Sequence, residues 1–290
     1  MEFVPTTRLR ARNAAGPPGL YRQTDCRQKG DVSMPRVIPF VLFPVAGAVA
    51  AGLRYSQRLH AFTSEGLVIP GQGVTVALIV LSVVVVLGAL LYSARCRVEP
   101  DEKIAAREGG GASSSLAIVA GFFLLVGGAA TALTSLELTA FVLRIAWLVL
   151  AALFVISGAL LVVRAVRLRR DSGASVGGLL LLPAFTCCLW LVLLYQGNAA
   201  DPVLMDYVFQ LFAAVCSLLG MYFLAGRDYG VRRPRRCVFF CLLAGYFALL
   251  CMADPLTSGA RVVLVALLLY LLLQAGLLSL GGKERRNHGG

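Results

Sequence analysis

Five polar side chains interrupt apolar segments of this sequence, and they are its main candidates for chemistry. They are Arg144, Asp206, Gln210, Asp254 and Gln274. Charged residues at membrane depth are costly, so they usually face the interior of a helix bundle and pair with one another. We therefore predict a polar cluster or ligand site in which Arg144 pairs with Asp206 or, as a second choice, with Asp254. The alternative is that Arg144 reaches the lipid head groups at the end of its helix.

The spacing of the other polar residues allows two interpretations. Asp206, Gln210 and Ser217 lie on one stripe of a helix, and Tyr270 and Gln274 are one turn apart. These side chains could line a polar cavity, or they could bond across neighbouring helices. Hydrogen bonds between membrane helices contribute about 0.6–2 kcal/mol each, so simple helix association is a sufficient explanation.

No catalytic or metal-binding residues are expected. The two histidines, His60 and His288, stand far apart, and no zinc-protease, serine-hydrolase or P-loop motif occurs. The eight cysteines include no Cys-x-x-Cys pair, and most of them fall in apolar segments, where cysteine behaves as a small apolar residue. We predict that the chain is not an enzyme and that it holds no cofactor and no metal.

The composition indicates which elements must position these residues. Of 290 residues, 58% are hydrophobic and only 14% are charged, whereas a soluble domain has roughly 25% charged residues. These values exclude a disordered chain, a small disulfide scaffold and an ordinary soluble globule. They fit an integral membrane protein with several spans.

Eight apolar segments are long enough to be transmembrane helices. Within lipid each segment must satisfy its own backbone hydrogen bonds, so even the valine-rich segments are predicted as helices. The predicted fold class is all-α, a polytopic integral membrane protein with about eight transmembrane helices. The segments are residues 38–53, 74–92, 116–133, 138–163, 176–195, 203–224, 238–252 and 262–280.

The basic residues predict the orientation. Clusters of Lys and Arg follow the second, fourth, sixth and eighth segments, and Arg164 and Arg227 are counted among them. The opposite loops are assigned only Arg54, Arg58 and Arg261. Under the positive-inside rule, both termini then lie in the cytoplasm and the protein lies in the cell membrane. The net charge of +12 is explained by this orientation signal, and we expect no nucleic-acid partner.

A faint repeat divides the chain into two four-helix halves, residues 34–170 and 171–282. Ala120-Gly121-Phe122-Phe123 in the third segment matches Ala244-Gly245-Tyr246-Phe247 in the seventh. Two units of four helices would have the same orientation in the membrane, and a ligand site would be expected between them. Chance is the alternative, because apolar segments match one another easily.

The ends of the chain are interpreted separately. Residues 1–33 form a basic tail without an apolar run, and residues 283–290 form a short cytoplasmic tail. The codons of Lys29-Gly30-Asp31 can spell a bacterial ribosome-binding site shortly before Met34. We therefore expect that translation starts at Met34 and that the source is bacterial.

Three classes of function remain after these exclusions. The first is an accessory or scaffold protein that binds lipid or a membrane protein partner. The alternative is a small-molecule permease or permease subunit with a site between the two halves. A permease predicts a water-accessible cavity lined by Arg144, Asp206, Gln210 and Gln274, whereas a scaffold predicts a dry interior. A membrane enzyme is less supported, because no nucleophile, acid pair or metal site can be identified.

Overall fold

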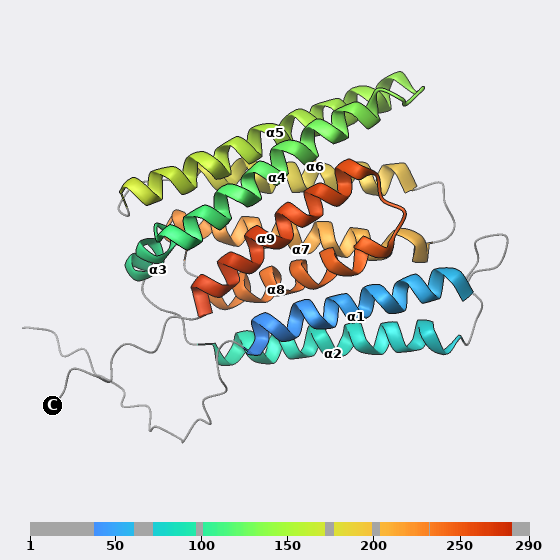
Figure 1. The fold of residues 1–290 in the computed structure, drawn as a ribbon, viewed down its shortest axis with the longest axis horizontal. Helices are drawn as coiled ribbons and strands as arrows, with labels where there is room; N and C mark the ends of the chain where they lie inside the picture. The colour runs from blue at the N-terminus through green and yellow to red at the C-terminus, as the bar shows by residue number, and fades with distance from the viewer. Residues whose placement is uncertain are drawn as a thin grey trace, which may run out of the picture. The chain divides into compact units, whose positions relative to one another are not determined.

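The chain forms long helices that alternate in direction along the sequence (Figure 1). The computed structural model describes residues 38–60, 72–96, 101–171, 177–198, 204–231 and 233–279. In these ranges every regular element is helical, which confirms the all-α class. The elements are α1 (Ile38–His60), α2 (Gly73–Arg95), α3 (Asp101–Glu108), α4 (Gly111–Ser135), α5 (Phe141–Arg170), η1 (Gly177–Leu180), α6 (Leu181–Asn198), α7 (Leu204–Asp228), α8 (Pro234–Leu250), η2 (Cys251–Ala253) and α9 (Ser258–Ser279).

Seven of these helices are long and apolar enough to cross a membrane, namely α2 and α4 to α9. The chain is therefore a multi-pass helical membrane protein. Helix α1 has 23 residues but is not among the seven. Its second half carries Arg54, Gln57 and Arg58, which make it more polar than the others. The predicted total of eight spans stays a prediction.

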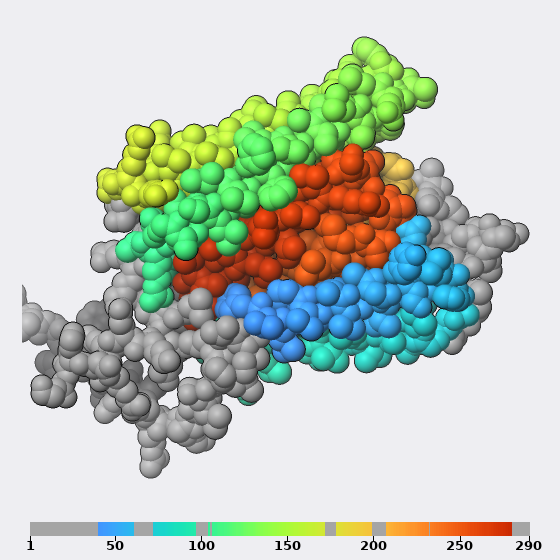
Figure 2. All heavy atoms as spheres, viewed as in Figure 1, coloured from blue at the N-terminus to red at the C-terminus, as the bar shows by residue number. Residues whose placement is uncertain are grey.

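Helices α8 and α9 form the centre of the bundle. Helix α8 contacts α1, α2, α7 and α9, and all its residues from Cys241 to Ala248 are buried. Helix α9 packs against α8 on one side and α4 on the other, and Figure 2 shows the surfaces of α4 and α9 in direct contact. Because α8 is covered on all sides, it must be apolar around its whole circumference, as its sequence is.

Small residues bring α4, α5 and α9 into close contact. A Cβ atom added to Gly158 of α5 would lie 2.7 Å from the carbonyl oxygen of Gly121 of α4. A Cβ atom on Gly127 would lie 2.8 Å from a methyl group of Val263 on α9. Glycines allow such backbone approach in membranes, where dispersion contacts must replace the hydrophobic effect between helices. Glycine at these positions therefore sets the spacing of three helices.

Several helices extend further than their apolar segments predicted, among them α7, which continues past residue 224 to Asp228 and so includes Arg227. Helix α1 continues past residue 53 to His60, and α5 continues past residue 163 to Arg170. The extensions bring Arg54 and Arg164 into helices and not into loops, which corrects the assignment made from charge alone. Pro183 belongs to another of these helices. It lies in the first turn of α6, where its missing N–H is not needed by the helix.

The two predicted halves share extensive contacts. Helices α1 and α2 of the first half pack on α8 of the second, and α4 packs on α9. The described helices all lie within Pro35–Gly290, a single unit. The division at residue 170 and the internal repeat stay predictions. The expectations for residues 1–33 and 283–290 concern residues outside the described ranges.

The glycine contacts yield a prediction with a matched control. Gly158→Ala should destabilise the protein by about 1–3 kcal/mol, because its new methyl group would overlap the backbone of α4. Gly88→Ala places the same methyl group on α2, where nothing lies within 4 Å, and should be neutral or slightly stabilising. Thermal unfolding of both purified variants in detergent measures the difference. Equal midpoints would contradict the close α4–α5 contact.

Candidate functional site

The five predicted site residues do not form one cluster. Asp254 follows η2 at one end of the bundle. Gln274 lies near the far end of α9, about 24 Å of helix rise beyond Ser258. Gln210 is half-buried on α7, close enough to Asp254 to affect its titration. Asp206 belongs to the first turn of α7, and its side chain is outside the described part, so its pairing with Arg144 stays a prediction.

Arg144 has a local role in the structure. Its Nε and Nη2 atoms donate hydrogen bonds of 2.8 and 2.6 Å to the carbonyl oxygen of Leu138. This carbonyl precedes α5, so the guanidinium closes the turn that leads into the helix. Asp254, the second partner predicted for Arg144, pairs instead with Arg54.

The first polar cluster surrounds Asp254, and we call it the Asp254 cluster. Arg54 of α1 donates from Nε to Oδ1 of Asp254 at 2.8 Å, and both side chains are fully buried. Arg54 also donates from Nη1 to Gln57 at 2.8 Å, and Gln57 donates to Thr75 of α2 at 2.9 Å. This chain of bonds ties α1 and α2 to the segment between α8 and α9.

Two further groups complete the Asp254 cluster. Arg58, one turn after Arg54, places Nη1 3.8 Å from Oδ1 of Asp254. The guanidinium carbon of Arg54 lies 5.2 Å from the centre of the Phe209 ring, a cation–π distance. Burial raises the pKa of Asp254 above its ordinary value, and the nearby Arg54 offsets only part of this effect.

The second cluster lies at the other end of α9 and centres on Glu108, the last residue of α3. We call it the Glu108 cluster. Oε2 of Glu108 accepts a 2.9 Å bond from Nη2 of Arg164 on α5, and Oε1 accepts a 2.6 Å bond from Nη2 of Arg227 on α7. Each carboxylate oxygen thus binds one guanidinium. All three side chains are nearly inaccessible, with 4%, 4% and 11% exposure for Glu108, Arg164 and Arg227.

Asp228 and Tyr270 complete the Glu108 cluster. Nη2 of Arg164 lies 3.4 Å from both carboxylate oxygens of Asp228, and its Nη1 donates to the Tyr270 hydroxyl at 3.4 Å. The cluster therefore holds two guanidinium groups and two carboxylates, so its charges balance. A balanced arrangement is required because an unpaired charge at such depth costs several kcal/mol.

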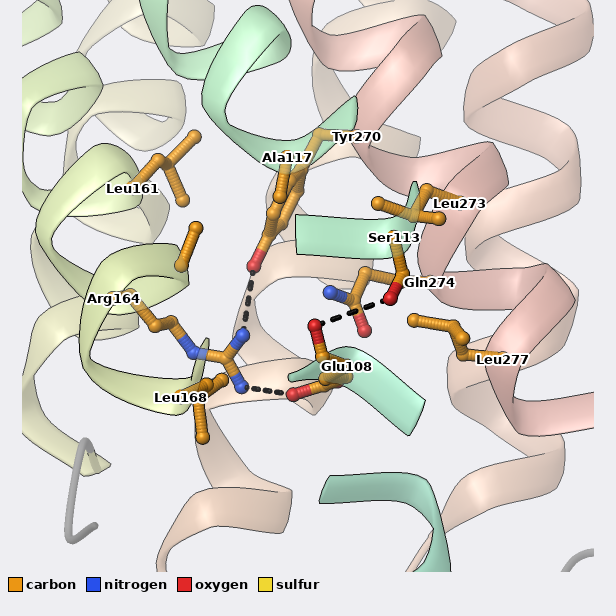
Figure 3. Close-up of a pocket in the computed structure, with 11 residues that line it drawn as sticks. Glu108, Ser113, Ala117, Leu161, Arg164, Leu168, Tyr270, Leu273, Gln274 and Leu277 are labelled. Carbon is orange, nitrogen blue, oxygen red and sulfur yellow. Dashed lines mark hydrogen bonds and ion pairs between the residues drawn. The ribbon is translucent and has the colours of Figure 1, made fainter. Parts of the chain in front are cut away.

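A small cavity adjoins this cluster (Figure 3). Its volume is about 10 Å³, which is room for about one water molecule. Tyr270 and Gln274 of α9, Glu108 and Arg164 are among the residues that line it, and Figure 3 shows the Arg164 guanidinium between the Tyr270 hydroxyl and Glu108. Among the described residues, Nε of Arg164, Nη1 of Arg227 and Oε1 of Gln274 are buried without a hydrogen-bond partner.

The electrostatics of Glu108 follow from this geometry. Burial by itself would raise its pKa, but the charges and hydrogen bonds of Arg164 and Arg227 outweigh burial, and the pKa ends below its ordinary value. Glu108 is therefore a carboxylate that the folded protein stabilises in its charged form. The bond between its backbone oxygen and Ser113 further fixes the end of α3 against the start of α4.

The sequence interpretation missed the charged residues that form these clusters. Arg54, Arg164 and Arg227 were counted as orientation signals in loops, yet each is a buried part of a helix. One signal could have found Arg164: it shares a helix face with the buried residues Leu161 and Leu168, whereas Arg167 and Arg170 point elsewhere. Likewise, Arg54 and Gln57 are three residues apart on one face of α1.

A double-mutant cycle tests the Asp254 cluster. Asp254→Asn should lower the free energy of unfolding by about 3–5 kcal/mol, because it leaves a buried arginine without its charged partner. The double variant Arg54→Met/Asp254→Asn should cost less than the sum of the two single variants. Arg261→Met removes an exposed arginine at the start of α9 and should change stability by at most about 0.5 kcal/mol. Strict additivity in the unfolding cycle would contradict the pairing.

The titration of Glu108 yields a prediction on pH. Its folded pKa lies below the ordinary value of 4.5, so its contribution to stability is complete above that pH and is lost as the pH falls through the folded pKa. Glu108→Gln should remove this acid-dependent loss, whereas Glu137→Gln, at an exposed loop position, should retain it. Unfolding midpoints measured between about pH 7 and about pH 3 compare the variants with the wild type. An unchanged acid slope in Glu108→Gln would refute the assignment.

Comparisons with protein-family models, with curated proteins and with solved structures find no match for this chain. Its function is therefore inferred from the geometry of the two clusters and of the core between them.

Proposed function

We propose that this chain is an accessory or scaffold protein of the cell membrane, which binds lipid or a membrane protein partner through its outer helix faces. The observation that supports this proposal is the closed packing of the bundle centre between the two clusters. Leu242 and Tyr246 of α8 and Leu267 and Leu271 of α9 are all buried there. A solute pathway would need a polar lining at this depth.

Two pairs of polar groups at this depth bond across helices. The hydroxyl of Tyr246 on α8 lies 2.9 Å from Oγ of Ser82 on α2. Ser157 of α5 and Thr186 of α6 are joined by a 2.8 Å hydrogen bond. Each bond connects two helices. It also occupies donors and acceptors that a passing solute would otherwise use. They are the arrangement expected of a helix bundle whose interior has a structural role.

The proposal includes eight spans with the arginine-rich end in the cytoplasm. At 1.5 Å per residue, the 23 residues of α1 extend about 34 Å, enough to cross the hydrocarbon core. With α1 counted, successive spans alternate and one end gathers exposed arginines, as the positive-inside rule requires of a cytoplasmic face. These arginines are Arg95, Arg167, Arg169, Arg170, Arg233, Arg235 and Arg236.

The outer face of α1 offers a place to test the accessory role. Ala48 and Gly52 are exposed one turn apart, and a Cβ atom on Gly52 would meet nothing within 4 Å. Small residues at this spacing allow a second membrane helix to approach closely. The face therefore suits a transmembrane helix of a partner protein.

Gly52→Leu is expected to abolish crosslinking of the chain to a partner protein in native membranes, while its thermal unfolding remains that of the wild type. Gly88→Leu is the matched control, because Gly88 of α2 is also exposed with open space at its Cβ position. It should leave the crosslinked product intact. Absence of any protein adduct in the wild type, with only lipid adducts formed, would reject the partner-binding role.

A second candidate function, a small-molecule permease, is favoured by one observation. Buried charged groups join different helices at both ends of the bundle, at Asp254 and at Glu108. Ionisable groups within membranes often mark solute pathways, and clusters at two ends could close a pathway alternately. Light-scattering measurements of solute-driven swelling, on vesicles that contain wild type or Glu108→Gln, test this candidate. A permease predicts solute flux that the variant alters, whereas the accessory role predicts none.

A further inference from the structure

The Glu108 cluster has the composition of a binding site that is already occupied. Two arginines from separate spans, Arg164 and Arg227, converge on one carboxylate and contribute one hydrogen bond to each of its oxygens. The Tyr270 hydroxyl adds a third polar group beside Arg164. The group that they hold belongs to α3, which is not one of the seven apolar helices.

Helix α3 is held by few contacts. It has eight residues and lies in the connection between α2 and α4. Among its described side chains, Ile104 and Glu108 are buried, and they lie one turn apart on one face. A short polar helix with two buried anchors belongs to the low-stability part of a fold, so it can open without disturbing a membrane span.

The arginines retain binding capacity that Glu108 does not use. Nε of Arg164 and Nη1 of Arg227 are buried and have no acceptor within the described part of the chain. The adjoining cavity of about 10 Å³ is too small for an organic anion while Glu108 is in place. An anion of that kind therefore fits only where the Glu108 carboxylate now lies.

We infer that Arg164, Arg227 and Tyr270 form a binding site for a small free carboxylate, with the Glu108 side chain as its built-in, displaceable occupant. The class of ligand follows from the occupant, because the site already binds a carboxylate with one oxygen on each guanidinium. The net charge of the site without Glu108 also indicates a carboxylate ligand. Withdrawal of Glu108 leaves two guanidinium groups and the Asp228 carboxylate, an excess of one positive charge that a monoanion neutralises.

Binding at this site would release α3. A free carboxylate and Glu108 compete for the same guanidinium groups, so the ligand stabilises the state in which α3 is withdrawn. The inference does not depend on the accessory role, because either an accessory protein or a permease could respond to such a ligand through α3.

Acetate is the probe for the experiment, and full-length protein in detergent is the sample. Hydrogen exchange of the α3 amides is measured by mass spectrometry in sodium acetate and in sodium chloride of equal ionic strength. At ten times its dissociation constant, acetate should increase the exchange of wild-type α3 amides about tenfold over the chloride value. Exchange in the α4 and α9 spans should not change.

Two variants locate the effect. Glu108→Gln should exchange rapidly in α3 without acetate, and acetate should raise its unfolding midpoint. Adding Arg227→Gln to Glu108→Gln should abolish this rise, because one of the two guanidinium groups is lost. If Glu108→Gln does not fold, the hydrogen exchange of wild-type α3 in acetate and in chloride is sufficient to test the inference.

Two outcomes would overturn the inference. Exchange of wild-type α3 that is the same in acetate and chloride would show that Glu108 is a fixed structural group, even if acetate stabilises the Glu108→Gln variant. An equal effect of sodium phosphate at the same ionic strength would exclude selectivity for carboxylates. Neither outcome bears on the crosslinking test of the accessory role, so the two proposals can fail separately.

Discussion

The balance of buried charge at Glu108 is the constraint on which this end of the bundle depends. Arg164 and Arg227 approach from α5 and α7, and their burial is tolerable only because Glu108 and Asp228 neutralise them. Glu108 in turn belongs to α3, so a segment outside the seven apolar helices completes the electrostatics within them. The charge balance between α5 and α7 thus depends on a helix of eight residues in the connection between α2 and α4.

The rest of the described bundle can be mainly apolar because its buried charged groups are gathered at the two ends. The Asp254 cluster joins α1, α2 and the turn before α9 through hydrogen bonds and ion pairs. The Glu108 cluster joins α3, α5 and α7 in the same way. Between them the helices pack through leucine, alanine and glycine, and the contact of Gly121 with Gly158 lets α4 and α5 approach closely. The polar ends fix which helices are neighbours, and the small residues fix how near they lie.

The sequence was sufficient for the helices but not for the sites. Long apolar runs predict helices because lipid leaves the backbone no other way to satisfy its hydrogen bonds. A helix predicted in this way ends where the apolar run ends. Arg54 and Arg164 directly follow two such runs, so they were assigned to loops. Their burial depends on partners distant in sequence, 200 residues away for Asp254 and 56 for Glu108, and no local pattern contains such pairings. Gln274 of the predicted site is buried, yet its neighbours could not be identified without the fold.

Helix α9 gives the two clusters a physical connection. Asp254 lies just before its first residue, and Tyr270 and Gln274 lie near its end. Helix α9 packs along its length against α4 and α8, so the two clusters border one continuous, well-packed element. Two charge clusters on such an element differ from two isolated ion pairs, because both are built around the two ends of the same helix. The shared helix is a physical reason for a bundle to retain charged groups at both ends, although apolar residues would pack at lower cost. These groups are Arg54, Asp254, Glu108, Arg164, Arg227 and Asp228.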